Sequence, residues 1–410
     1  MSEKQFGFRP QRSTVHAITL ANITLESNHK SRKTSLIATR DVCKAFDSVW
    51  HRGLLFKINE IFSNIDNKID IIILIKEFLE MREITPIFNQ VKGKVIKPLA
   101  GVPQGSSLGP ILYLIFSNDH PKPIHTDTII TQYADDMVHI VCSDGHGRKR
   151  TKQAIQKMEH ELTNTLQWEQ NWKIKTNLQK SNIHYLGTSK ETLEKFGGVR
   201  VNNTNIPIKK ETKILGTNIR FNTKGNYHAM NVAKKARIHQ NKLYRFINAP
   251  EKVKKTLFKT LIRPIMEYPC TILHKIHKTY THKLQVVQNK GLRFIKNVKF
   301  KDRVNMKDIH QELNIEPINV RISRLKNKVV NRMKENYYVK QNQDRNIFYK
   351  FSDFTLSHPP IRKRRYTVAQ RIERNILNPR GHNNIIKQEP SIDNWQEPEP
   401  IYSTTRTRTT

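Results

Sequence analysis

The segment TIITQYADDMVHIV, residues 128–141, carries two runs rich in β-branched and aromatic residues on either side of an acidic pair. Such runs favour β-strands, and a short break between them favours a tight turn. We therefore expect a β-hairpin with Asp135 and Asp136 at its tip. An isolated pair of aspartates is more often a solvent-exposed turn, but the apolar residues directly before and after this pair favour a packed hairpin.

A third acidic residue follows another apolar run. Residues 35–38, SLIA, predict a strand that leads to Asp41. Carboxylates that crowd together disfavour joint ionisation unless a cation lies between them, and magnesium prefers such oxygen ligands. If the strand brings Asp41 to the hairpin tip, three carboxylates could hold two Mg²⁺ ions about 3.5–4 Å apart, the arrangement used for in-line phosphoryl transfer.

The rest of the chain predicts further alternation of helices and strands and then a mainly helical region, which makes the fold class α+β. The expected elements are helices at 45–60 and 68–82, a Gly- and Pro-rich loop at 99–110, a helix or strand at 111–116, a helix at 154–172 with Ile155, Met158, Leu162 and Leu166 on one buried face, a helical region at 225–345, and a flexible basic tail after Tyr349.

Composition narrows the class of partner. Lys and Arg number 72 against 35 Asp and Glu, a formal net charge of +37, so a nucleic acid is the expected partner; a merely basic soluble protein is the alternative. Three scattered cysteines fit neither a disulfide framework nor a zinc site, and favour a reducing, intracellular setting. The longest apolar run, 69–75, is interrupted by Asp70, and it predicts a buried helix segment rather than a membrane span.

Six blocks follow one another along the chain: QFGFRPQRST (5–14), DVCKAFDSVWHRGLL (41–55), AGVPQGSSLGPILY (100–113), QYADDMV (132–138), WKIKTNLQKSN (172–182) and KILG (213–216). In this order they resemble the fingers motif and motifs A to E of the reverse transcriptases of non-LTR retrotransposons, LINE-type and jockey-like elements in particular. Residues 261–268 and 284–295 resemble the thumb of that family. Six ordered blocks are far more specific than any one of them.

The resemblance implies a right-hand polymerase. Its expected parts are partial fingers at 1–34, a palm at 35–222, a helical thumb at 223–300, a helical basic extension at 301–348 and a disordered tail at 349–410. No endonuclease and no upstream finger strands precede these parts, so we expect the chain to be a piece of a longer element protein.

The resemblance also implies roles for single residues, several of which have an ordinary alternative. Phe46 could be a core aromatic, the loop at Gln104 just a turn, and any Lys or Arg a solvated charge. The implied roles are metal ligation by Asp41, Asp135, Asp136 and the Val42 carbonyl; exclusion of a ribose 2′-hydroxyl by Phe46; nucleotide contact by Gln104; close approach of the template-primer at Gly105; protonation of the leaving pyrophosphate by Lys180; and triphosphate contact by Arg9 and Arg12.

The implied function is RNA-directed DNA synthesis with two Mg²⁺ ions, or Mn²⁺ in their place. The implied partners are template RNA, primer DNA and dNTPs, without a membrane, and the implied compartment is the nucleus. The sequence leaves the oligomeric state open.

The two residues just before Asp41 depart from the family pattern. Thr39 and Arg40 stand where that family usually has apolar residues, and in a strand Arg40 would point to the core, where an unpaired guanidinium is costly. It either pairs with an acid elsewhere or marks a decaying site. A decaying site would make the chain an inactive retrotransposon remnant that only binds nucleic acid. A further alternative is an intron-type maturase, which the thumb blocks resemble less well.

Overall fold

A four-stranded antiparallel sheet positions the three acids Asp41, Asp135 and Asp136. The computed structural model describes residues 2–64, 68–143, 148–220, 225–299 and 301–338. The strands are β1 (Ser35–Arg40), β4 (Ile129–Tyr133), β5 (Asp136–Cys142) and β6 (Asn182–Leu186), in the spatial order β4-β5-β1-β6. The strand expected at 35–38 and the hairpin expected at 128–141 are confirmed.

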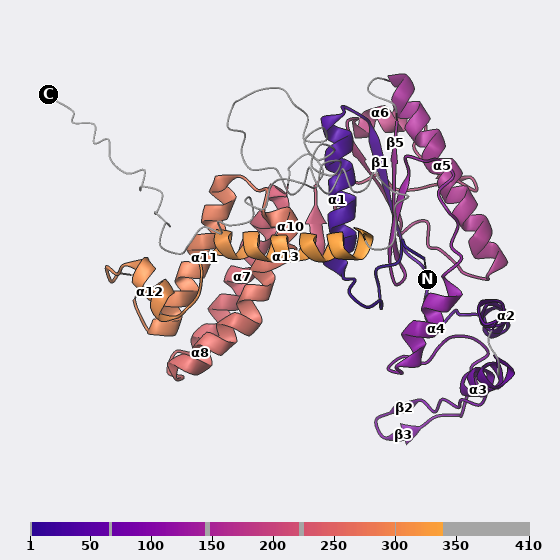
Figure 1. Ribbon diagram of the computed structural model, residues 1–410, viewed down its shortest axis with the longest axis horizontal. Helices are drawn as coiled ribbons and strands as arrows, with labels where there is room; N and C mark the ends of the chain where they lie inside the picture. Colours follow the sequence, from indigo (N-terminus) through magenta and orange to yellow (C-terminus); the bar gives the residue numbers. More distant parts are fainter. Residues whose placement is uncertain (1, 65–67, 144–147, 221–224, 300, 339–410) are drawn as a thin grey trace, which may run out of the picture. The chain divides into compact units, whose positions relative to one another are not determined.

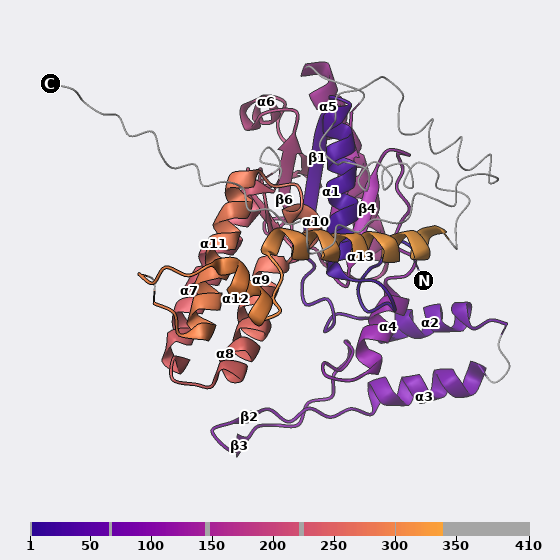
Figure 2. The same ribbon diagram turned by 60° about the vertical axis from the view of Figure 1, so that its left-hand side comes forward.

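Two long helices cover opposite faces of this sheet, α1 (Thr14–Lys30) and α5 (Arg148–Asn171) (Figure 1; Figure 2). Successive side chains of a strand alternate between the two faces. Leu36 and Ala38 of β1 accordingly pack with α5, whereas Ile37 packs with α1. The helix predicted at 154–172 is confirmed, and its apolar face is buried at Ile155, Met158 and Leu162 and partly buried at Leu166.

Three further helices, α2 (His51–Ile61), α3 (Lys68–Glu80) and α4 (Leu108–Phe116), share a separate apolar core. The run 111–116, for which helix and strand were both open, is helical. A short hairpin of β2 (Ile87–Phe88) and β3 (Val91–Lys92) lies between α3 and α4 in the chain.

The helix predicted at 45–60 is wrong over its first part. Residues 43–48 form turns, and α2 begins only at His51. The carbonyls of Phe46 and Val49 accept hydrogen bonds from the backbone N–H groups of Val102 (2.9 Å) and Gly101 (2.8 Å). A loop distant in sequence therefore takes the acceptors that a helix would have used.

The prediction that 69–75 is a buried helix is half correct. The run is helical in α3, but Ile69, Ile73 and Leu74 are exposed. Only the side of the helix that carries Ile72 and Ile75 packs into the shared core. Within the described parts of the chain, no helix is both long and apolar enough to cross a membrane.

Short elements connect the sheet to the helical region. They are α6 (Lys190–Lys195), the hairpin of β7 (Arg200–Val201) and β8 (Thr204–Asn205), and the hairpin of β9 (Thr212–Ile214) and β10 (Thr217–Ile219). The second hairpin turns at Leu215 and Gly216, both at positive φ. The Tyr268 hydroxyl donates a hydrogen bond to the Leu215 carbonyl, which ties this turn to the helices that follow.

The helical region expected at 225–345 is confirmed as far as residue 338. Its elements are α7 (Asn226–Leu243), η1 (Tyr244–Phe246), α8 (Glu251–Leu257), the π-helical turn η2 (Phe258–Ile262), α9 (Arg263–Glu267), α10 (Cys270–Leu273), α11 (Lys278–Lys296), α12 (Met306–Glu312) and α13 (Ile318–Tyr338). They share one apolar core. The tail expected at 349–410 lies outside the described residues.

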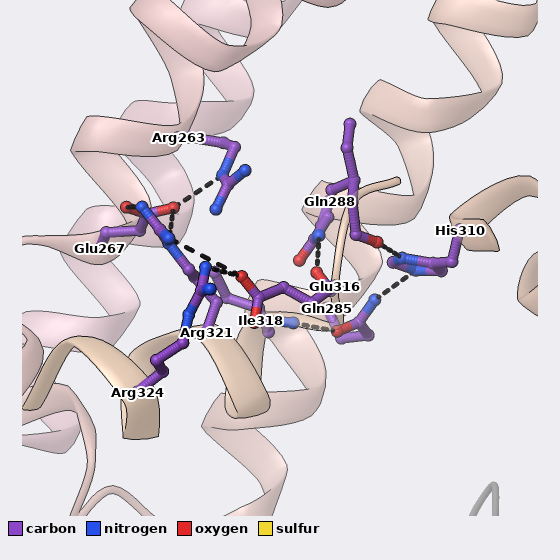
Figure 3. A network of polar contacts seen from close by, with 10 residues as sticks. Arg263, Glu267, Gln285, Gln288, His310, Glu316, Ile318, Arg321 and Arg324 are labelled. Atoms are coloured by element: carbon purple, nitrogen blue, oxygen red, sulfur yellow. Dashed lines mark hydrogen bonds and ion pairs between the residues drawn. The ribbon is translucent and has the colours of Figure 1, made fainter. Parts of the chain in front are cut away.

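Polar side chains hold α13 against α9 and α11 (Figure 3). The Glu267 carboxylate accepts hydrogen bonds from Arg263 (2.7 Å) and Arg321 (3.2 Å). The Gln285 side-chain oxygen accepts the first backbone N–H of α13, at Ile318 (2.9 Å), and the Gln288 side-chain amide donates to the backbone carbonyl of Glu316 (2.7 Å). Thr19 of α1 also donates to Thr271 of α10 (2.9 Å), which joins the sheet layer to these helices.

Candidate active site

The register of the sheet brings one acid of each motif together. Arg40 of β1 pairs with Met137 of β5, and one further step along this antiparallel register places Asp41 beside Asp136. Asp135 is the second residue of the two-residue turn between β4 and β5, and Asp136 is the first residue of β5. By strand alternation, Arg40 and Met137 lie on the α5 face, and Asp41 and Asp136 on the α1 face.

The Asp136 carboxyl group responds to this crowding. The surrounding protein displaces part of its water, and the negative charges of Asp135 and Asp41 act in the same direction, so the pKa of Asp136 is raised above its ordinary value. The described part of the chain holds no ready-formed group of three or more His, Cys, Asp or Glu side chains that could bind a metal ion. The site nevertheless fits a divalent cation, because an acid whose ionised form is disfavoured by two other acids gains from a positive charge between them.

The other neighbour of β1 is β6, and Lys180 lies in the turn just before it. Thr39 pairs with Asn182 of β6, two residues after Lys180. Lys180 is exposed, in a turn where its backbone N–H donates to the Asn177 side chain (3.1 Å). Lys180 is therefore a cationic residue in the turn that borders the end of β1.

The backbone of Asp41 is fixed by that same turn. The Asn177 N–H donates to the Asp41 carbonyl (2.8 Å), and the Asp41 N–H donates to the Ser181 hydroxyl (3.3 Å). Val42 is buried and forms an isolated antiparallel bridge with Thr176. These contacts hold the end of β1 where the expected ligands Asp41 and Val42 lie.

Arg40 has a partner in the core behind the acids. Its guanidinium forms an ion pair with Glu169 of α5, and both side chains are buried, at 2% and 1% exposed. The Thr176 hydroxyl accepts a further hydrogen bond from Arg40 (2.6 Å) and donates one to Glu169 (2.8 Å). Of the two alternatives that the sequence left open for Arg40, the structure shows the pairing with an acid, and this removes the unpaired guanidinium that favoured an inactive remnant.

Comparison with known families shows to which family a chain with these acids belongs. A family model described as "Reverse transcriptase (RNA-dependent DNA polymerase)" matches residues 1–219, more than half of the 410 residues. The chain belongs to the reverse transcriptase family. The matched segment contains the hairpin acids, Asp41 and Lys180.

The relatives of this reverse transcriptase include jockey-like elements, which confirms the resemblance seen in its sequence. The RNA-directed DNA polymerase from mobile element jockey of Drosophila melanogaster is 27% identical over 343 residues, which cover 80% of this chain and 35% of that protein. The probable RNA-directed DNA polymerase from transposon X-element of the same fly is 27% identical over 302 residues, which cover 72% and 32%. The chain thus spans about a third of the length of these curated relatives.

A solved structure is also similar to this reverse transcriptase. The apo telomerase of Candida tropicalis, truncated from its C-terminal domain, covers 53% of this chain, and the match covers 39% of that protein, with 16% identity and a TM-score of 0.38. At that score the likeness carries no argument.

Phe46, the expected sugar-contacting residue of the reverse transcriptase, lies in a row of aromatic rings. It stacks on Tyr113 of α4 with ring centroids 4.7 Å apart, and it meets the edge of Phe8 at 6.1 Å. Phe46 is half-buried, so one part of the ring packs in the core while the other is open. The packing fixes the ring whichever of its two expected roles it fills.

Gln104 and Gly105 of the reverse transcriptase occupy an open loop. The Gln104 amide donates to the Asp47 carboxylate (2.9 Å), and both residues are exposed. Gly105 has φ +87°, a backbone conformation that L residues rarely adopt, and a Cβ built there would meet no atom within 4 Å. The loop is thus accessible from outside.

The two expected triphosphate-contacting arginines are engaged within their own segment. Arg9 donates to the Ser2 carbonyl. Arg12 pairs with Glu3 and donates to the Gln5 carbonyl (3.1 Å). The structure therefore shows both side chains bracing the first residues of the reverse transcriptase, and their role toward a nucleotide stays a prediction.

Sequence reasoning missed the residues that hold the acids. Asn177 and Ser181, which bond to the backbone of Asp41, lie in the same block as Lys180. The block was visible, but only its charged residue Lys180 was singled out. Neutral side chains that hydrogen-bond to a backbone distant in sequence leave no periodic signal.

Proposed function

We propose that the chain is an RNA-directed DNA polymerase that extends a primer 3′-hydroxyl with dNTPs on template RNA. The observation that supports the proposal most is the convergence of Asp41, Asp135 and Asp136 at one end of the sheet, where loss of water and the charges of the other two acids raise the pKa of Asp136. The chain spans only about a third of its curated relatives, so the activity of the longer protein is part of this proposal.

The three acids and the Val42 carbonyl are the groups that would hold two Mg²⁺ ions, with Mn²⁺ as a substitute. When bound, the ions would polarise the phosphate oxygens and lower the pKa of the primer hydroxyl. Lys180, exposed in the turn that holds the backbone of Asp41, would give positive charge or a proton to the pyrophosphate as it leaves. Phe46, fixed by Tyr113 and Phe8, would press against the sugar and exclude a 2′-hydroxyl.

The segments of the chain would correspond to the parts of a right-hand polymerase. Residues 1–34 would serve as partial fingers, 35–222 as the palm and 223–300 as the thumb. The basic helical extension expected at 301–348 would be formed by α12 and α13, and its residues 339–348 lie outside the described residues. Gln104, on an accessible loop, and Gly105, with open space at its Cα, would face the nucleotide and the template-primer. Basic side chains would neutralise the phosphates of RNA and DNA. We propose the nucleus as the compartment, by analogy with mobile elements.

Primer extension on a homopolymer tests the proposal. An oligo(dT) primer on poly(rA), with dTTP and Mg²⁺, should be extended by the full chain, and Asp135→Ala or Asp41→Asn should reduce extension more than ~100-fold, beyond the 10–100-fold typical of residues that only support a metal ligand. Asp70→Asn, at an exposed aspartate of α3, is the matched control and should extend normally. Full extension by Asp135→Ala would remove the hypothesis. RNA binding without extension by the folded wild type would favour the inactive remnant.

A further inference from the structure

The turn that carries Asp135 contains a strained residue. Ala134 has φ +57°, a conformation in which the Cβ of an L residue is crowded by its own backbone. The two residues Ala134 and Asp135 connect β4 to β5, since Tyr133 pairs with Asp136. Such two-residue connections favour positive φ at their first central residue, where glycine is the usual choice. With alanine in this place, the turn needs support from elsewhere.

That support comes from one buried side chain. Gln5 is 4% exposed. Its side-chain oxygen accepts the backbone N–H of Ala134 (2.9 Å), and its side-chain nitrogen donates to the Ala134 carbonyl (3.2 Å). The amide therefore satisfies both backbone groups of the strained residue, which β-strand pairing leaves unused in the turn. The same oxygen also accepts the Gly7 N–H (2.8 Å), which orients the amide group.

The segment around Gln5 is itself docked on β4. The Phe6 N–H donates to the Gln132 carbonyl (2.8 Å), and the Gln132 N–H donates to the Lys4 carbonyl (2.9 Å). Gly7 lies so close to the turn that a Cβ added there would stand 2.4 Å from the Ala134 nitrogen. Only glycine permits this approach, so residues 4–7 form a fitted brace against the turn.

We propose that Gln5 is a positioning residue that holds the Ala134–Asp135 turn in its strained form and so sets the direction in which the Asp135 carboxylate points. The inference rests on the proposed function, because it gives Gln5 a role only through the metal-binding acids. Gln5 does not touch the substrate. Its effect is on how well three acids can share cations.

Two variants separate positioning from folding. Gln5→Ala removes both hydrogen bonds to Ala134 and the one from Gly7, and Gln5→Asn keeps the amide but shortens its reach by one methylene. Both should lower the extension rate at saturating dNTP by about 10–100-fold, as for other residues that support metal ligands, and shift the Mg²⁺ midpoint upward. The KM for dTTP should change little. Gln288→Ala, which removes another buried amide bonded to a backbone carbonyl, is the matched control and should lose stability without a change in the Mg²⁺ midpoint.

A compensating change supplies a readout that a purely structural role would not give. Ala134→Gly makes the positive φ favourable, so in the Gln5→Ala background it should recover part of the lost rate. Gly7→Ala should imitate Gln5→Ala. If Gln5→Ala and Gln288→Ala lose the same stability and neither alters the Mg²⁺ midpoint, the proposal is overturned.

Metal binding can be read without catalysis. Mg²⁺ should raise the melting temperature of the wild type, and Gln5→Ala should reduce that rise at subsaturating Mg²⁺. If the wild type shows the rise and Gln5→Ala reduces it, but the wild type extends no primer, the proposed polymerase function fails while the role of Gln5 is supported. If Gln5→Ala keeps the whole rise, the role of Gln5 fails and the polymerase function is untouched.

Discussion

Asp136 is the residue on which the crowding of negative charge is most visible. Its pKa is raised by loss of water and by Asp135 and Asp41, so the folded protein binds a proton at Asp136 more readily than the unfolded chain does. For such a group the free energy of unfolding falls as the pH rises through the titration of the carboxyl. At neutral pH and without a cation, the ionised acid therefore opposes folding, as is common where a site is built for function rather than stability.

We predict that Asp136→Asn raises the melting temperature in EDTA at pH 7.5 and weakens extension more than ~100-fold, beyond the effect typical of a supporting residue. Mg²⁺ should then stabilise the variant less than the wild type, because one of the repelling charges is gone. Thermal unfolding with and without Mg²⁺ measures both effects. Asp70→Asn, at an exposed residue distant in sequence from the three acids, is the control and should keep the Mg²⁺ response of the wild type. A lower melting temperature for Asp136→Asn in EDTA would contradict the electrostatic account.

The link between β1 and α5 shows what an element contributes to the site. Arg40 lies one residue before Asp41, and its buried ion pair with Glu169 anchors the end of β1 to the last turns of α5. A buried pair contributes little net stability, because both charges lose their water, but removal of one partner leaves the other charge buried alone. The pair therefore fixes the position of the strand end more than it stabilises the fold.

We predict that Glu169→Ala lowers the free energy of unfolding by about 3–5 kcal/mol, because Arg40 then stays buried without a carboxylate. The double variant Arg40→Leu with Glu169→Leu should recover most of this loss, since apolar residues of similar volume can replace a buried pair. Urea unfolding measures both. Gln170→Ala, at the exposed neighbour of Glu169, should change stability by less than ~0.5 kcal/mol, and an equally large loss there would show that α5 is simply intolerant of truncation.

Elements with a periodic or alternating pattern could be predicted from the sequence. The hairpin at 128–141, the strand before Asp41 and the buried face of 154–172 follow from local composition, and the structure confirms them. The turns at 43–48 could not be predicted, because the loop at 101–102 takes the carbonyls of Phe46 and Val49. The brace from Gln5 to Ala134 joins residues 129 apart in sequence, and no local pattern encodes it. Sequence reasoning thus found the acids but not what holds them.

At the scale of the whole molecule, positive charge and buried histidines act together. The chain has a net charge of +37 and 17 histidines. Several histidines are buried in different layers: burial lowers the pKa of His120 to about 3 and those of His16 and His184 to about 4. Arg40 adds to the shift at His120, and Arg332 and Arg12 add to the shift at His16. These imidazoles are neutral in the folded protein at pH 7.

Acid should therefore unfold this protein well before its carboxylates are all protonated. A base whose folded pKa lies below its unfolded value of about 6.5 is protonated first in the unfolded chain, so the free energy of unfolding falls as the pH drops below ~6.5 and goes on falling until the folded pKa is reached. The raised pKa of Asp136 acts in the opposite direction, but it is one group against several.

Urea unfolding at pH 7.5, 6 and 5, at constant ionic strength, should show a progressive fall in the free energy of unfolding. His184→Gln should lose less stability over this range than the wild type, because protonation of a buried histidine favours the unfolded chain. His282→Gln, at an exposed histidine of α11, is the control and should follow the wild type. Equal stability at pH 7.5 and pH 5 would show that the buried histidines gain their protons without unfolding.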